Sequence, residues 1–361
     1  MKTSFRTSRK VTRSIAAAGL LIPLFVAAVG APASAATTVF ADYRGPYPQG
    51  FAMPAYQYLN TSDATASQST GLVEITTTLG YGAGVAAGSG IVIGSDGLVV
   101  TNHHVVEGAT AITVTDVSTG QRYTADVVGY DATKDVAVLQ LKDATGLATA
   151  GTATGGVAVG DAVTAVGDAG GNGGSLTAAP GTVTDGHHPI TVQDDLTGAS
   201  VHLHNLIQVT SDVVPGDSGG ALLDAGGEVV GMNVAASSGG PDVTGYVIPI
   251  GRVLRIADAI VAGDASASVV VGGTAFLGVS LSTQDSAPTL AGVLAGSPAE
   301  KLGLAAGDTI TSLDGTSITT ADDLRTAVAA HQPGDTVSVA WTNADGTGHQ
   351  GSVTLVAGPV A

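Results

Sequence analysis

A glycine-rich serine motif at residues 216–220 (GDSGG) carries the strongest chemical signal in the sequence. A nucleophilic serine needs a tight turn that exposes its hydroxyl group, and it needs backbone N–H groups that can hold a developing oxyanion. Flanking glycines permit both features. The motif therefore predicts a nucleophile at Ser218. By itself it also fits the nucleophile elbow of α/β-hydrolases.

The sequence around the motif disfavours that elbow. The residues after it predict a strand, a turn at Asp224 and another strand, with no helix. The possible catalytic partners also precede the serine, whereas those of an α/β-hydrolase follow it. His103 and His104 end an expected hairpin, and Asp131 and Asp135 lie before and at the start of an apolar strand. The order His, Asp, Ser is that of the trypsin fold.

Short strands and turns must position these groups. Strands are expected at residues 91–93, 98–101, 111–116, 122–128, 136–141, 162–166, 228–234 and 243–248, with a D-G turn between the first two. A closing helix is expected at residues 250–261. Regular short strands of this kind predict a sandwich or barrel.

A smaller unit follows residues 263–273, whose composition is typical of a linker. Residues 297–300 (SPAE) form a capping box that predicts a short helix. A hairpin turn is expected at residues 314–315, and a second helix should run from Thr320 to about His331. Closing strands are expected at residues 337–341 and 352–356, so the unit combines strands with two helices.

Composition excludes several classes of protein. The 361 residues carry a formal net charge of −17, which argues against binding to nucleic acid or to an anionic membrane surface. There is no cysteine, so disulfides, thiolate metal sites and a cysteine nucleophile are excluded. His202 and His204 could share one strand face, but spacing fixes no third ligand. We therefore predict no metal site and no cofactor.

The N-terminus predicts export. Residues 1–13 are basic, residues 15–31 are apolar, and residues 33–35 (ASA) form a small-x-small cleavage site. These features predict a signal peptide over residues 1–35, cut after Ala35, and a secreted protein or one of the cell envelope. The alternative is an uncleaved membrane anchor. Residues 36–70 form an aromatic-rich segment that could pack on the next domain or on another subunit.

The motifs in this order resemble the HtrA-type (DegP-like) serine proteases, trypsin-fold enzymes with a C-terminal PDZ domain. The protease blocks are residues 88–91 (GSGI), 101–106 (TNHHVV), 135–141 (DVAVLQL), 215–222 (PGDSGGAL), 231–233 (GMN) and 245–249 (GYVIP). The PDZ-like blocks are residues 276–279 (FLGV), 296–299 (GSPA), 303–304 (GL) and 307–310 (GDTI). The resemblance implies a mainly β protein. Its two-barrel trypsin-like protease domain would cover residues 71–262, and its PDZ domain residues 274–361.

The resemblance also implies roles for single residues. Ser218 would be the nucleophile. The family's catalytic histidine follows Thr-Asn-x, which selects His104 over His103. Asp135 would orient His104, since Asp131 sits in the turn. The backbone N–H groups of Gly216 and Ser218 would form the oxyanion hole.

Two acids depart from the family pattern. Asp217 stands where HtrA-type enzymes usually have Asn, and a buried Asp needs a cationic or hydrogen-bonding partner. Asp212 lies six residues before Ser218, at the base of the primary specificity pocket in trypsin-fold enzymes. An acid there would select Arg or Lys, whereas the family prefers aliphatic side chains. The alternative for Asp212 is a loop residue turned to solvent or bonded to backbone.

In the PDZ-like unit, backbone N–H groups would receive a peptide's terminal carboxylate at Leu277, Gly278 and Val279. The peptide would add as a β-strand beside the second helix. Leu324 and Val328, one helical turn apart, are the expected groove wall, although core packing alone could explain them.

Together these features predict an exported serine endopeptidase that cleaves exposed or misfolded polypeptides, with a PDZ domain that binds peptide ends. The resemblance implies quality control of exported proteins and a possible homo-oligomer, often a trimer, which could form through residues 40–60. One alternative is a PDZ-bearing peptide-binding protein or holdase without proteolysis. An esterase on an unrelated fold is a further alternative.

Overall fold

The computed structural model describes residues 25–28, 60–79, 84–194, 200–237, 244–282 and 287–360. Most of the predicted signal peptide, and residues 36–59 with the expected oligomer contact, lie outside these ranges. Phe25–Ala28, within the predicted signal peptide, forms strand β1, which pairs with β10. No helix in the described ranges is both long and apolar enough to cross a membrane.

The first barrel closes through six antiparallel strands in the order β3-β4-β5-β8-β7-β6. Its strands are β3 (Leu72–Leu79), β4 (Gly84–Gly94), β5 (Leu98–Thr101), β6 (Ala109–Asp116), β7 (Arg122–Asp131) and β8 (Val136–Leu141). Apolar side chains alternate inward along them, as Ile112 and Val114 do on β6, because successive residues of a strand face opposite sides. They form one buried cluster with Val73, Ile75 and Leu139.

The second barrel closes in the same way in the order β9-β10-β11-β14-β13-β12. Its strands are β9 (Ala162–Gly167), β10 (Thr177–Asp194), β11 (Ser200–Val209), β12 (Ala221–Asp224), β13 (Val229–Ser237) and β14 (Thr244–Pro249). Strand β2 (Ser62–Asp63) pairs with β10 outside this ring. The sequence did not predict β10 and β11, because Pro180, two glycines and several histidines interrupt their apolar pattern.

Helix α2 (Ile250–Ala262) covers both barrels and ends at Gly263, whose φ is 78°. Its buried face presents Ile250, Val253, Ala257 and Ile260 to the large cluster that joins the barrels. This spacing places the four side chains on one side of a helix. After α2, Val269–Val271 forms strand β15 on the edge of β7, inside the segment expected to be a linker.

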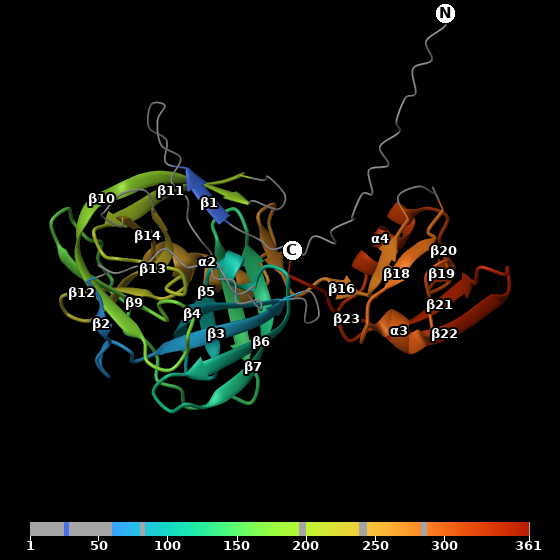
Figure 1. The fold of residues 1–361 in the computed structure, drawn as a ribbon, viewed down its shortest axis with the longest axis horizontal. Helices are drawn as coiled ribbons and strands as arrows, with labels where there is room; N and C mark the ends of the chain where they lie inside the picture. The colour runs from blue at the N-terminus through green and yellow to red at the C-terminus, as the bar shows by residue number, and fades with distance from the viewer. Residues whose placement is uncertain are drawn as a thin grey trace, which may run out of the picture.

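The C-terminal unit lies beside the first barrel (Figure 1). Its elements are β16 (Ala275–Phe276), β17 (Val279–Leu281), β18 (Leu290–Val293), α3 (Pro298–Leu302), β19 (Thr309–Leu313), β20 (Thr316–Ser317), α4 (Ala321–Ala329), β21 (Thr336–Thr342), β22 (Gly348–Thr354) and β23 (Val356–Ala357). Half of the capping box predicted at Ser297 is present: the Ser297 side chain accepts from the Glu300 amide, whereas Glu300 Oε2 accepts from the Gly296 amide. Thr320, where the second helix was expected to begin, forms a full capping box with Asp323.

Candidate active site

Helix α1 (His103–Val106) and the start of β8 bring His104 against Asp135. Asp135 Oδ2 lies 2.8 Å from His104 Nδ1, and Asp135 Oδ1 accepts a hydrogen bond from the His104 backbone amide at 3.0 Å. Asp135 has a left-handed backbone (φ 56°), which non-glycine residues seldom adopt. Its carbonyl accepts a hydrogen bond from Asn102 Nδ2 at 3.0 Å, which fixes that conformation. The Asp135 carboxylate therefore contacts both the ring and the main chain of His104.

Electrostatics favours the charged forms of this pair. Burial opposes the imidazolium, but the negative charge and hydrogen bond of Asp135 outweigh burial and raise the pKa of His104 above its ordinary value. Burial likewise opposes ionisation of Asp135, but the charge and hydrogen bonds of His104 lower the pKa of that carboxyl group. An ionised carboxylate only accepts hydrogen bonds, so Nδ1 carries a proton in both forms of the ring, and in the neutral ring Nε2 has the lone pair.

The two competing residues have other contacts. The His103 ring is buried and stacks on Tyr130 with ring centroids 4.7 Å apart. Asp131 caps its own turn, because its Oδ1 accepts hydrogen bonds from the amide and hydroxyl of Thr133. Its Oδ2 accepts a hydrogen bond from Ser268 Oγ at 3.0 Å. The structure thus pairs His104 with Asp135 and places Asp131 elsewhere.

Ser218 sits in a tight turn between β11 and β12. The Asp217 amide donates to the Val214 carbonyl, and the Gly220 amide donates to the Asp217 carbonyl. A Cβ on Gly219 would lie 2.1 Å from the Ser89 carbonyl oxygen, so the close packing excludes any side chain there. The flanking glycines are thus required by sterics as well as by the turn.

The turn and the histidine helix meet at Gly88. A Cβ on Gly88 would lie 2.8 Å from Val105 Cγ1 and 3.2 Å from the Ser218 carbonyl oxygen. Val105 is the neighbour of His104 on α1. The backbone of Ser218 and helix α1 therefore both pack close to Gly88 on β4. Within the described ranges, Ser218 and His104 share no hydrogen bond; such bonds often tighten only when substrate binds.

Two carbonyl contacts orient the amides expected to hold an oxyanion. The Pro215 carbonyl accepts from the Gly170 amide at 2.7 Å, and a trans peptide points its N–H away from its carbonyl. The Gly216 N–H therefore faces away from Gly170. The Asp217 carbonyl accepts from Gly220, which turns the Ser218 N–H away in the same manner. In the described part of the chain neither amide donates a hydrogen bond.

Both unusual acids are bonded to backbone. Asp217 is buried, and its Oδ2 accepts from the Val214 amide at 2.8 Å. Asp212 is half-buried, and its Oδ2 accepts from the amide of Asn60 at 2.6 Å. Asn60 belongs to the N-terminal segment, so that segment reaches the residue expected at the base of the specificity pocket.

In the C-terminal unit, one cavity of about 300 Å³ gathers all five residues expected at the peptide groove. They are Leu277, Gly278, Val279, Leu324 and Val328. Strand β17 pairs only with β18 among the described strands, so its other edge faces this cavity beside α4. An unpaired strand edge next to a helix is the arrangement that accepts an added peptide strand.

Comparison with known proteins adds sequence similarity to this geometry. A trypsin-like peptidase domain model matches residues 88–232, and a PDZ domain model matches residues 275–347. Serine protease Do-like HtrA of Lactococcus lactis subsp. lactis is 32% identical over 293 residues, which cover 74% of this chain and 70% of that protein. The chain belongs to the HtrA family of serine proteases. The resemblance and the mainly β fold class are thereby confirmed.

Other HtrA relatives match over shorter parts. Probable serine protease do-like of Buchnera aphidicola is 38% identical over 153 residues, which cover 42% of this chain and 30% of that protein. The chain matches between 30% and 50% of the length of the first three curated relatives. The serine endoprotease from Yersinia pestis, a solved structure, is 23% identical with a TM-score of 0.45, over 82% of this chain and 99% of that one.

Sequence reasoning missed two residues beside the site of this HtrA chain. Ser89, fully buried, donates from its amide to the Ser218 carbonyl and from its hydroxyl to the Gly216 carbonyl, each at 2.8 Å. The Gly170 amide donates a hydrogen bond to the Pro215 carbonyl. Ser89 lay within a quoted family block, and a serine between two glycines in a strand was the available signal. Gly170 lies in a glycine-rich loop that gave no signal.

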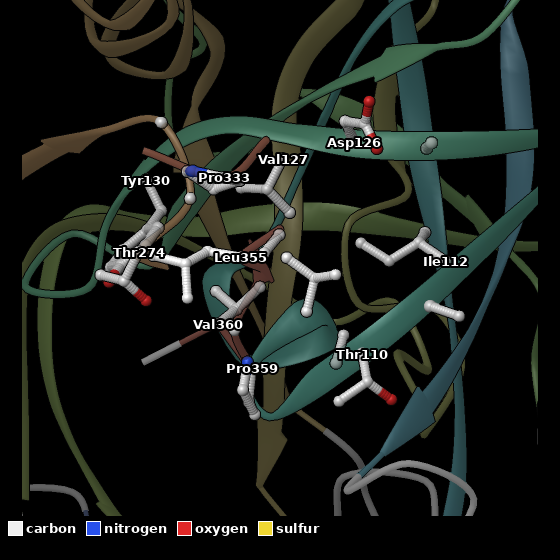
Figure 2. A pocket seen from close by; sticks show the side chains of 18 of the residues that line it. Thr110, Ile112, Asp126, Val127, Tyr130, Thr274, Pro333, Leu355, Pro359 and Val360 are labelled. Carbon is white, nitrogen blue, oxygen red and sulfur yellow. The ribbon is translucent and has the colours of Figure 1, made fainter. Parts of the chain in front are cut away.

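A larger cavity, of about 490 Å³, lies between the first barrel and the C-terminal segment of the HtrA chain. Figure 2 shows side chains that line it. Ile112 and Val127 line it from β6 and β7, and Val360 lines it from the chain end. The Gly108 amide donates to the Val360 carbonyl at 2.7 Å, and the Val360 amide donates to the Ala109 carbonyl at 3.3 Å. None of the predicted site residues lines this cavity.

No group of three or more possible ligands for a metal ion occurs among the residues with a described position. His202, considered in the sequence as one of a histidine pair, has its Nδ1 2.8 Å from Thr191 Oγ1.

Proposed function

We propose that this HtrA chain is a serine endopeptidase that hydrolyses peptide bonds in exposed segments of polypeptides. The observation that carries the proposal is the pairing of Asp135 with His104 through Nδ1, which leaves Nε2 as a base. The position of the Ser218 turn beside α1 supports it. Clustering of a base, its orienting acid and a partly exposed serine is the arrangement that nucleophilic catalysis needs.

In the proposed mechanism, Ser218 Oγ attacks the carbonyl carbon and its proton passes to His104 Nε2. The carbonyl oxygen becomes an oxyanion held by the amides of Gly216 and Ser218. His104 then gives the proton to the leaving amine as the C–N bond breaks, which leaves an acyl ester on Ser218. Water attacks that ester with His104 again as base, and the carboxylic acid product leaves. Asp135 stabilises the imidazolium at each stage without taking its proton.

The groove between β17 and α4 would bind the terminal residues of a polypeptide. The carboxylate would meet the amides of Leu277, Gly278 and Val279, and an apolar side chain would lie against Leu324 and Val328. This binding would present substrates to the protease domain. Export of the chain, signal cleavage after Ala35, a role in quality control and homo-oligomerisation belong to the same proposal. The relative from Escherichia coli is named a periplasmic endoprotease.

The test is to incubate the purified chain with a sequence-diverse peptide mixture and to map every cut by mass spectrometry. Ser218→Ala serves as the matched variant. Cuts that vanish in the variant establish the protease, and the residue before each cut decides the role of Asp212. Arg or Lys there supports an acidic specificity pocket, and Val, Ala or Leu contradicts it. Absence of any cut from a folded wild-type chain would support the peptide-binding alternative.

A further inference from the structure

Ser89 links the two barrels through hydrogen bonds next to Ser218, the proposed nucleophile. It lies on β4 of the first barrel with no exposed surface. Its amide donates to the Ser218 carbonyl at 2.8 Å, and its hydroxyl donates to the Gly216 carbonyl at 2.8 Å. The hydroxyl also accepts from the Asp168 amide at 2.9 Å, and its own carbonyl accepts from Thr101 Oγ1 at 2.7 Å. Ser89 of the first barrel thus bonds to both Gly216 and Ser218, the two ends of a short segment of the second barrel.

The held segment contains both amides expected to bind the oxyanion. Gly216 has a φ of 94° and no side chain, so its backbone can adopt many conformations unless contacts restrict it. Two hydrogen bonds restrict it. The Gly170 amide donates to the Pro215 carbonyl, which precedes the Gly216 amide, and Ser89 Oγ donates to the Gly216 carbonyl, which follows it. The direction of the Gly216 N–H depends on both.

Only a hydroxyl group fits the position of the Ser89 side chain. It must donate to Gly216 and accept from Asp168 at the same time, which a hydroxyl can do and an alkyl group cannot. Without it, a buried carbonyl and a buried amide would both lose their partner. A larger side chain has no free space, because Ser89 is completely enclosed and Gly219 packs against its carbonyl.

We propose that Ser89 is a positioning residue that fixes the Gly216 amide in the direction required to stabilise the oxyanion. The proposal rests on the proposed function, since it concerns the tetrahedral intermediate of that reaction. Ser89 does not touch substrate. It acts through the Gly216 carbonyl, so its removal should slow the chemical step and leave substrate binding and the His104–Asp135 pair intact.

The experiment measures kcat, KM and the pH profile of kcat/KM for the full chain and for Ser89→Ala, on a peptide chosen from the mapped cuts. Thr77→Val is the matched control. Thr77 is equally buried, and its hydroxyl donates to a backbone carbonyl of β4, at Ala86, outside the site. Thermal unfolding of every variant reports whether it is folded.

We expect Ser89→Ala to lower kcat by about 10–1,000-fold, where the upper limit is the effect of losing one oxyanion donor completely, with KM changed less than about threefold. The pH midpoint should stay at its wild-type value, and Thr77→Val should keep its kcat. Ser89→Cys, which retains a weak donor of similar size, should fall between wild type and Ser89→Ala. It also serves as the test if Ser89→Ala does not fold.

Four results would overturn the assignment. The first is a folded Ser89→Ala chain with wild-type kcat. The second is an equal loss of kcat in Thr77→Val and the third is a shifted pH midpoint in Ser89→Ala, since either would indicate a general structural effect. The fourth is loss of folding in both Ser89 variants while Thr77→Val folds. A wild-type chain that cleaves no peptide would instead refute the proposed function, on which this inference depends.

Discussion

Asp135 binds His104 at two points, with Oδ2 2.8 Å from the ring Nδ1 and Oδ1 3.0 Å from the backbone amide. The two contacts share one planar carboxylate, so the ring cannot turn without disturbing the main chain of α1. The left-handed backbone of Asp135 aims the carboxylate at that place. Strained backbone of this kind persists where neighbouring contacts hold it, here the Asn102 side chain on the Asp135 carbonyl.

The pH dependence of kcat/KM should reflect the raised pKa of His104. His104 must be neutral to accept the serine proton, and its pKa lies above the ordinary 6.5, so kcat/KM should rise with pH through a midpoint above 6.5. Asp135→Asn removes the charge and the hydrogen bond that raise this pKa most and leaves only the smaller effect of Glu107 against burial, so the midpoint should fall. The rate should also drop by about 10⁴-fold, since the carboxylate no longer fixes the tautomer. A wild-type midpoint below 6.5 would contradict this account.

Stability should depend on pH through the same pair. The folded-state pKa of His104 is raised, so its contribution is complete below about 6.5 and is lost as pH rises through the folded value. The folded-state pKa of Asp135 is lowered from 3.8, so its contribution is present above that value and is lost as pH falls through the folded value. The difference in unfolding free energy between wild type and Asp135→Asn should therefore be largest near pH 5, at about 1–3 kcal/mol. Denaturant melts from pH 4.5 to 8.5 measure it. A difference that grows toward pH 8 would refute the linkage.

Gly216→Ala should abolish activity for a steric reason. Its Cβ would lie 1.9 Å from the Asp168 carbonyl oxygen, so the loop that carries both amides proposed to hold the oxyanion must move. We expect kcat/KM to fall by at least about 100-fold. Gly227→Ala is the matched control, because Gly227 has a similar positive φ of 82° but no atom within 4 Å of the added Cβ. It should cost about 1 kcal/mol of stability and leave the rate unchanged. Equal rates for both variants would be inconsistent with the packing described.

Charge in the peptide groove should weaken binding of chain ends. Val328→Lys places an ammonium group in the cavity that Leu324 also lines, and burying that charge is unfavourable. We expect the affinity for a peptide with an apolar C-terminus to fall about tenfold or more, measured by fluorescence anisotropy with Ser218→Ala as background. Thr326→Lys adds the same charge to the exposed side of α4 and should not change affinity. Equal effects from the two variants would place the peptide elsewhere.

The sequence predicted elements whose local signals agree with their final environment. The D-G turn, the strand before His103, the Ser297 cap, the start of the second helix at Thr320, and helix α2 are all local in origin. The family block also selected His104 over His103, and the structure brings His104 and Asp135 together. Each of these required only a short stretch of chain.

Contacts between distant segments could not be predicted in this way. Ser89 meets Gly216 across 127 residues, and Asn60 meets Asp212 across 152 residues. Strand β10 was missed because its 18 residues curve through register shifts against β11, which destroys simple alternation. Val269–Val271 was assigned to a linker, since its pairing with β7 depends on the first barrel being closed.

The C-terminal unit is fastened to the protease at two separate places. Strand β15 joins the edge of β7 just before the unit begins, and Val360 pairs with residues 108 and 109 just after it ends. A body held at one point can swing in any direction, but a body held at two points turns only about the line that joins them. Wider motion of the PDZ domain therefore requires Val360 to release the segment that directly follows the helix of His104.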